Sequence, residues 1–324
     1  MQSITRTQLA LMLHSVPHLG SKGIARLISE LPPGLPNEQI ELDDIKALTL
    51  SAGDLRREYK LRPKAADHIA SRKQKLLLES RKAAYLVQKL GIRVLITLDP
   101  DYPTCLKEYE INPAPIIYTY GNLSLLRERK FAVVSSSGVQ PQGIGVTRGL
   151  AGILCSEGLT AVTSHNTQAY KAVELAARSG GFPVIFVLDR GIMSAFHNGL
   201  DWEPVSQARI WNIRFDPKRD LIVSKFRLQD AWIGANGMER DRMVFALADV
   251  VIAVEVRPGG VMEKECLHAH KKGREVYVYM PESGEVLEGN KGLLEKGCRP
   301  IPVSWARSVL ATLDLPSDQT DSYE

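Results

Sequence analysis

The 324-residue sequence lacks any run of about 18 apolar residues, so we expect no membrane-spanning helix. Its first residues lack a basic stretch followed by an apolar core, and we therefore expect no secretion signal. The four cysteines are far apart and form no CxxC pair, which is typical of reduced thiols in a cytoplasmic protein rather than of a disulfide framework. These absences predict a cytoplasmic globular protein, and its length is sufficient for two domains.

Net charge is also low, at +4, but it is unevenly distributed. Residues 1–90 carry 15 Lys/Arg and 9 Asp/Glu, whereas the remaining residues carry 26 and 28. Within the first part, residues 56–89 hold 11 basic and 3 acidic residues. This basic segment predicts contact with a polyanion, the alternative being a solvated helix face. The final residues, 303–324, are predicted to form an acidic tail, and residues 314–324, with four acidic residues and no basic one, are expected to be disordered.

The first 90 residues predict a small helical domain. Residues 7–31 have apolar residues at helical spacing on both sides of a break, "VPHLGSKG". The break resembles a helix–hairpin–helix motif, in which backbone N–H groups of the hairpin meet a DNA phosphate. His18 stands at the place of the motif's first glycine. A structural copy of the motif without DNA contact remains the alternative, and residues 41–90 are expected to be helical.

From residue 92 onward, apolar runs alternate with helix-like segments. The runs predict strands at 92–99, 115–121, 131–135, 159–164, 183–188, 220–224, 249–255 and 275–280. Helices are expected at 143–157, 168–179, 239–248 and 261–272. Strands that are apolar throughout and alternate with helices predict an α/β fold with a mostly parallel sheet and helices on both faces.

Ligands of such a sheet bind beyond the carboxyl ends of its strands. The loop after strand 131–135 fits G-x-x-x-x-G, but neither Lys nor Ser/Thr follows, so a P-loop hydrolase is excluded. A dinucleotide fingerprint fails because Arg148 replaces its last glycine. The loop still offers the hydroxyls of Ser135, Ser136 and Ser137, the open backbone of Gly138 and a following helix N-terminus. It predicts either a phosphate-binding loop or a plain strand–helix connection.

Two other stretches carry residues suited to anions. Gly259 and Gly260 follow a strand and precede a helix, and they form a second candidate anion cradle. Arg240 and Arg242 lie at the start of another helix, where they would bind phosphates or form a structural salt bridge.

Residues for catalysis or metal binding are scarce. A Cys–His pair at 266 and 270 shares a helix face but lacks further ligands, so no metal site is predicted. No G-x-S-x-G elbow or Ser/His/Asp set is present. We therefore predict no catalytic residue and no cofactor.

Several motifs together resemble the DprA family, also called Smf, over about residues 7–302. They are "DPDYPTCLKEYEINPAPIIYTYGNLSLL", "ERDRMVFALADVVIAVEV", "GGVMEKECLHAHKKGREVYVYMP" and "EGNKGLLEKGCRPI", the last of which includes Asn290. The resemblance implies a Rossmann-like domain at 91–302, preceded by the helix–hairpin–helix or SAM-like helical domain at 1–90. The winged helix that ends some members is not expected in residues 303–324.

The sequence departs from the family mainly in the expected pocket. The family's Gly-Ser-Arg loop reads Ser135-Ser136-Ser137, so its arginine is gone. Its second loop reads Thr-Ser-His-Asn from residue 163. Lysines stand at two changed positions, Lys225 and Lys264. They could restore positive charge at other points of the pocket.

The resemblance implies a non-enzymatic, single-stranded DNA-binding protein that acts in DNA uptake by natural transformation, in recombination through RecA loading, or in DNA defence. A RecA-type recombinase and a second copy of the chain, as a homodimer, are the implied partners. The residues expected to hold DNA phosphates are Ser135, Ser136, Ser137, Gly138, Ser164, His165, Asn166, Lys225, Arg240, Arg242, Gly259, Gly260, Lys264 and Asn290. The alternatives are a nucleotide sensor or partner-binding protein with a changed pocket and, on the weak match of "PGGVMEKE", a nucleotide phosphoribohydrolase.

Overall fold

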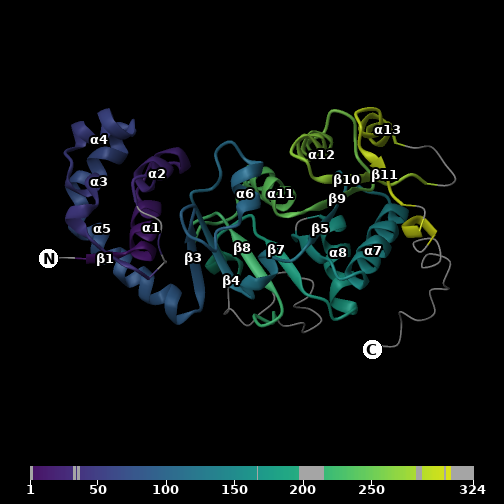
Figure 1. Ribbon diagram of the computed structural model, residues 1–324, viewed down its shortest axis with the longest axis horizontal. Coiled ribbons are helices and arrows are strands. Elements are labelled where there is room, and N and C mark those ends of the chain that lie inside the picture. The colour runs from purple at the N-terminus through teal and green to yellow at the C-terminus, as the bar shows by residue number, and fades with distance from the viewer. Residues whose placement is uncertain are drawn as a thin grey trace. The chain divides into compact units, whose positions relative to one another are not determined.

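The computed structural model divides the chain into two compact units (Figure 1). Unit 1 comprises Met1–Gly121, Arg190–Asp216 and Ile222–Trp232, and unit 2 comprises Asn122–Asp189, Pro217–Leu221 and Ile233–Glu324. The structure describes residues 3–31, 34, 37–165, 167–196, 215–281, 287–302 and 304–307. Most of the predicted acidic tail lies outside these ranges. The domain boundaries expected from the sequence stay a prediction.

Unit 1 begins with the predicted helices and an unpredicted small sheet. Its elements are β1 (Ser3–Thr5), α1 (Arg6–Ser15), α2 (Ser21–Ile28), β2 (Gln39–Glu41), η1 (Leu42–Asp44), α3 (Lys46–Thr49), α4 (Ala52–Tyr59) and α5 (Pro63–Lys89). Thr5 and Gln8 cap α1 reciprocally, and Ser51 caps α4. Pro63 starts α5, where a missing N–H costs nothing. The 27-residue α5 packs along α1 and carries most of the basic segment.

The remainder of unit 1 is built on an antiparallel pair. Strands β3 (Ile92–Ile96) and β4 (Ile116–Gly121) pair with Ile92 opposite Tyr120, and α6 (Thr104–Tyr109) lies between them in sequence. The short helix α9 (Ile192–Ala195) and most of β8 (Leu221–Ser224) also belong to this unit.

Unit 2 contains a six-stranded parallel sheet. Its strands are β5 (Lys130–Val134), β6 (Thr160–Thr163), β7 (Val184–Val187), β9 (Val250–Ala253), β10 (Glu275–Val278) and β11 (Arg299–Pro300). They run in the order β11-β10-β9-β5-β6-β7, and all neighbouring strands in this order are parallel. The order reverses between β5 and β9, as in a Rossmann fold. The predicted fold class is therefore confirmed.

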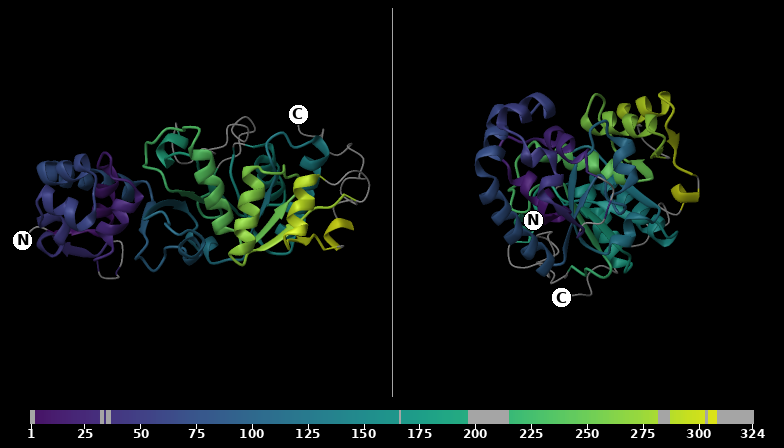
Figure 2. Two further views of the ribbon diagram at one scale, coloured as in Figure 1. Left: turned by 90° about the horizontal axis from the view of Figure 1, so that it is seen from above. Right: turned by 60° about the vertical axis from the view of Figure 1, so that its left-hand side comes forward.

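Helices cover both faces of this sheet (Figures 1 and 2). Helices α7 (Pro141–Ser156) and α8 (Gln168–Ser179) pack on each other and on β5 and β6. Helix α11 (Asn236–Leu247) leads into β9, and α12 (Val261–Lys271) and α13 (Glu288–Glu295) follow β9 and β10 on the other side of the reversal. Right-handed crossovers on either side of the reversal place these two sets on opposite faces. The short η2 (Leu123–Leu126) precedes β5.

The core of unit 2 lies between the sheet and its helices. All residues of β5, β6, β7 and β9 are buried, which explains why their sequences are mostly apolar and rich in β-branched residues. Within the described ranges, no helix combines the length and the apolar character that a membrane span needs.

Candidate phosphate-binding site

The sheet of unit 2 places two glycine-containing loops next to each other. The loop after β5 (residues 135–140) and the loop after β9 (residues 254–260) leave neighbouring strands at the point where the strand order reverses. Open α/β sheets bind their ligands in the crevice at such a point. The exposed or half-buried residues there form what we call the switch-point edge: Ser136, Ser137, Gly138, Arg257, Gly259, Gly260 and Lys264.

Hydrogen bonds hold the two loops together. The Ser136 N–H donates to the Glu255 carbonyl at 2.8 Å, and the Arg257 N–H donates to the Ser136 Oγ at 3.0 Å. The Val254 N–H also donates to the Val134 carbonyl at 3.0 Å. The hydroxyl of Ser136, one of the predicted phosphate donors, therefore accepts a bond that joins the loops.

The N-terminus of α7 is occupied by a carboxylate of the chain itself. Gln140, which precedes the helix, provides no side-chain cap. Instead, the Gln140 N–H donates to Oε2 of Glu255 at 2.9 Å. A Cβ on Gly143 would lie 2.1 Å from Oε1 of Glu255, so only glycine leaves room for this carboxylate. Negative charge is stabilised at a helix N-terminus, and Glu255 takes the place that a phosphate was expected to take.

The N-terminus of α12 is arranged in the same way. Glu263 is buried, and its Oε2 accepts a hydrogen bond from the Gly259 N–H at 2.6 Å. The Lys296 Nζ lies 3.3 Å from Oε1 of the same carboxylate. Gly259 has a φ of +70°, which favours glycine at this turn. Both predicted anion cradles thus bind an internal carboxylate.

Positive charge reaches the switch-point edge from an arginine that the sequence analysis did not single out. Arg257 is exposed, and its Nη2 lies 2.9 Å from where a Cβ on Gly138 would stand. Gly138 adopts a φ of +78°, a conformation that favours glycine, and the absence of a Cβ leaves room for the Arg257 guanidinium beside it. Lys264 is exposed in the first turn of α12. Arg257 therefore brings a guanidinium to the loop whose own arginine is replaced by Ser137.

Arg240 lies in a buried cluster instead of on the surface. Its Nε is 2.9 Å from Oδ1 of Asp241, its Nη1 donates to the Ser164 Oγ at 3.0 Å, and its guanidinium stacks over the Tyr170 ring at 5.0 Å. The Tyr170 hydroxyl donates to Asp241 at 2.8 Å. Burial raises the pKa of Asp241, and the adjacent Arg240 opposes that rise. Phosphate binding by Arg240 would require these contacts to break.

Ser164, His165 and Arg242 also have partners within the protein. The Ser164 Oγ donates to the Val187 carbonyl at 2.8 Å, and the His165 Nε2 lies 3.6 Å from Asp189. Arg242 contacts Glu265 at 3.2 Å and Glu239 at 3.4 Å. Ser135 is buried, Lys225 belongs to unit 1, and Asn166 lies outside the described residues.

Asn290 fastens the loop after β9. Its Oδ1 accepts from the Val256 N–H at 3.0 Å, and its Nδ2 donates to the carbonyls of Val254 at 2.8 Å and Tyr279 at 2.9 Å. A Cβ on the preceding Gly289 would lie 2.1 Å from the Val256 carbonyl oxygen, so α13 can approach only because this residue is glycine. Asn290 therefore fixes the loop after β9, and all three of these side-chain hydrogen bonds are to backbone groups.

No cluster of His, Cys, Asp and Glu suited to a metal ion occurs in the part of the chain that the structure describes. Three of the cysteines are buried. Burial raises the pKa of the Cys155 thiol to about 12 and also raises the pKa of Cys266 and Cys298. These three thiols therefore remain protonated and are poor nucleophiles.

Comparisons with known proteins agree with one another. The family model of DNA recombination-mediator protein A matches residues 93–312. The X-ray structure of DNA processing protein A (DprA) from Streptococcus pneumoniae is similar over 96% of this chain and 98% of that chain, with a TM-score of 0.65 and 21% identity. DNA processing protein A from Helicobacter pylori, described for its single-stranded DNA binding mode, is similar over 69% of this chain and 96% of that chain, with a TM-score of 0.53 and 21% identity. No curated protein sequence matches significantly.

Proposed function

The chain belongs to the DNA recombination-mediator protein A family and has a role in DNA processing, and we propose that it performs this role by binding single-stranded DNA at the switch-point edge of unit 2. The observation that carries the proposal is the position of Arg257 beside Gly138, with Lys264 on the neighbouring helix. Cations of this kind neutralise DNA phosphates without reading the bases, so the binding would be independent of sequence.

The internal carboxylates decide where the phosphates would lie. Glu255 and Glu263 occupy the N-termini of α7 and α12, so these helix ends are not free for DNA. The phosphates would instead contact the side chains of Arg257 and Lys264 and the exposed Ser137 hydroxyl. The substitution of the loop arginine by Ser137 would thus change the geometry of binding without abolishing it.

The proposal extends to what the protein does with the strand. It would act in the cytoplasm as a homodimer, without catalysing a reaction, and would pass the strand to a RecA-type recombinase. Family membership supports the recombination role. The protonated state of the three buried cysteines supports a role that uses no thiol nucleophile.

The test is the affinity of the full chain for a labelled single strand over a series of salt concentrations. Replacing Arg257 or Lys264 by Ala should weaken binding, and each lost phosphate contact should reduce the salt slope by about 0.7. Arg129→Ala is the matched control, because it removes an exposed arginine at the opposite, amino-terminal edge of the same sheet. If R257A and K264A bind the strand as tightly as R129A does, the switch-point edge is not the binding site.

The same preparation tests the main alternative. A nucleotide sensor would be stabilised by a mononucleotide or dinucleotide in a thermal-shift panel, and its melting temperature would rise with ligand concentration. A single-stranded DNA-binding protein would be stabilised by oligonucleotides and not by the panel.

A further inference from the structure

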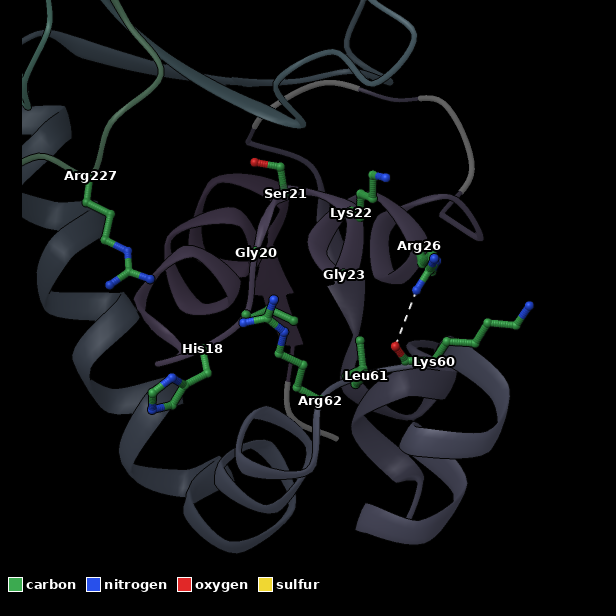
Figure 3. Close-up of a pocket in the computed structure, with 11 residues that line it drawn as sticks. His18, Gly20, Ser21, Lys22, Gly23, Arg26, Lys60, Leu61, Arg62 and Arg227 are labelled. Atoms are coloured by element: carbon green, nitrogen blue, oxygen red, sulfur yellow. Dashed lines mark hydrogen bonds between the residues drawn. The ribbon is translucent and has the colours of Figure 1, made fainter. Parts of the chain in front are cut away.

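A pocket of about 490 Å³ opens in unit 1 beside the turn between α1 and α2 (Figure 3). Three separate stretches of the chain form it: the turn with helix α2, the junction of α4 and α5, and the segment after β8. The residues that line it are His18, Leu19, Gly20, Ser21, Lys22, Gly23, Arg26, Lys60, Leu61, Arg62 and Arg227.

The lining is strongly cationic. Five of its residues are Lys or Arg and none is Asp or Glu: Lys22, Arg26, Lys60, Arg62 and Arg227. Arg26 donates to the backbone carbonyls of Tyr59 and Lys60, and Arg227 donates to the carbonyl of Val16. Within the described residues, no carboxylate forms an ion pair with any of the five. Cations gathered around one hollow repel each other, and a bound anion would relieve that repulsion.

Other basic residues of the segment 56–89, by contrast, form ion pairs with carboxylates. Arg56 pairs with Asp67, and Arg57 pairs with Asp54. Lys75 lies 3.7 Å from Glu79. The lack of ion pairs among the lining cations, within the described ranges, is thus a local property, and it is not shared by the whole basic segment.

The backbone of the pocket is unusual as well. His18, with a φ of 63°, and Lys60, with a φ of 52°, are the two non-glycine residues in the described ranges that adopt a left-handed conformation. Both line the pocket. Non-glycine residues pay for this conformation, and such strain gathers at binding sites. The two strained residues therefore lie in the same pocket as the five cations that have no ion-pair partner among the described residues.

We propose that this pocket is a second nucleic-acid site, independent of the switch-point edge, and that it holds the sugar-phosphate backbone of duplex DNA. Its chemistry addresses phosphates alone, through five cations and the uncapped N-terminus of α2. No Phe, Tyr or Trp of the described chain lines this pocket, so its lining is directed at phosphates and offers bases no stacking surface beyond the His18 ring. A duplex, whose bases are turned inward, needs no such platform.

Gly20 offers a sharp test because it precedes α2 with an extended backbone, φ −84° and ψ 171°. Nothing lies within 4 Å of a Cβ placed there. Gly20→Asp would put a carboxylate among the five cations, and because Asp is a favoured N-cap residue the melting temperature should stay or rise. Gly20→Asn is the matched control, since Asn caps equally well and carries no charge.

The probe is a labelled duplex closed by hairpins at both ends, with a single strand titrated in parallel. G20D should bind the duplex about tenfold more weakly than G20N and show a smaller salt slope. Its affinity for the single strand should equal that of G20N. Equal duplex affinities of G20D and G20N would overturn the proposal, and an equal loss for duplex and single strand would overturn the assignment to duplex DNA.

A second variant, outside the α1–α2 turn, tests whether the loss of duplex binding depends on the pocket or only on the turn. Arg62→Ala removes a lining cation at the α4–α5 junction, and Lys89→Ala removes an exposed cation at the far end of α5. R62A should weaken duplex binding and K89A should not. Failure of this pattern, together with retained loss of single-strand binding in R257A, would overturn the pocket and leave the switch-point edge intact.

Discussion

Removing the charge of the carboxylate at the N-terminus of α7 should strengthen DNA binding, whereas most mutations in a binding site weaken it. Glu255→Gln keeps an oxygen that can accept the Gln140 N–H bond but removes the negative charge from the switch-point edge. If DNA phosphates approach this edge, the natural side chain repels them. The variant should therefore bind single-stranded DNA more tightly than the wild type.

The magnitude follows from the partial exposure of the site. A phosphate about 4 Å from a carboxylate is opposed by about 4 kcal/mol at an effective dielectric constant near 20. Glu255 is half-buried, and a phosphate held by Arg257 can lie farther away, so solvent and salt screen most of this repulsion. We expect about tenfold tighter binding, or about 1.4 kcal/mol. Losing the charge at the helix N-terminus should lower the free energy of unfolding by about 0.3–1 kcal/mol.

Fluorescence anisotropy with a labelled single strand measures the gain, and a salt series shows its origin. The gain should shrink as salt rises, because the Debye length falls from about 10 Å at 0.1 M to about 3 Å at 1 M. Glu275→Gln is the control, since Glu275 begins β10 at the opposite edge of the sheet and pairs with Arg129. If E255Q binds no more tightly than E275Q, phosphates do not approach α7 and the reasoning is refuted.

Three further predictions concern stability. Arg240→Met should lower the free energy of unfolding by about 3–5 kcal/mol in urea denaturation, because it leaves Asp241 buried without its cation; an unchanged midpoint with lost DNA binding would show a surface role instead. Asn290→Ala should cost about 1–3 kcal/mol by the same assay and weaken single-strand binding, since it frees the loop after β9. Burial, with Arg227 nearby, lowers the pKa of His14 from 6.5 to about 4. Between these two pH values only the unfolded chain binds the proton, so the free energy of unfolding of unit 1 should rise by at most about 3 kcal/mol from pH 4 to 6.5 and then level off. Thermal melts across this range should show the rise in the wild type and not in His14→Gln, and a flat wild-type profile would count against it.

Much of the fold could be predicted because its signals are local. The runs at 131–135 and 249–255 are β-branched and apolar, and they become the central strands β5 and β9. Helices α7, α8, α11 and α12 were expected within a few residues of their observed ends. The small β1–β2 sheet was missed, because three-residue strands carry too little pattern to detect.

The contacts of the candidate site could be predicted only in part. The glycine loops after two strands were expected as two separate anion cradles, and only the fold shows that hydrogen bonds join them. The partner of Gln140, however, is Glu255, 115 residues away, and no local pattern announces such a pairing. Arg240 was expected either to bind phosphates or to form a structural salt bridge, and the fold shows the salt bridge, with Asp241. Its other partners, Ser164 and Tyr170, are distant in sequence and were visible only in the fold. Arg257 was visible in "RPGG", but its proximity to Gly138 was not.

The bonds from Asn290 to the backbone of Val254, Val256 and Tyr279 have a consequence for the thermodynamics of binding. They fix the loop after β9 while the protein folds, so its conformational entropy is already lost before any ligand arrives. Association at that edge would then proceed on a preorganised surface, with little ordering cost on the protein side. Its entropy change would come mainly from released counterions and from the ordering of the DNA strand itself.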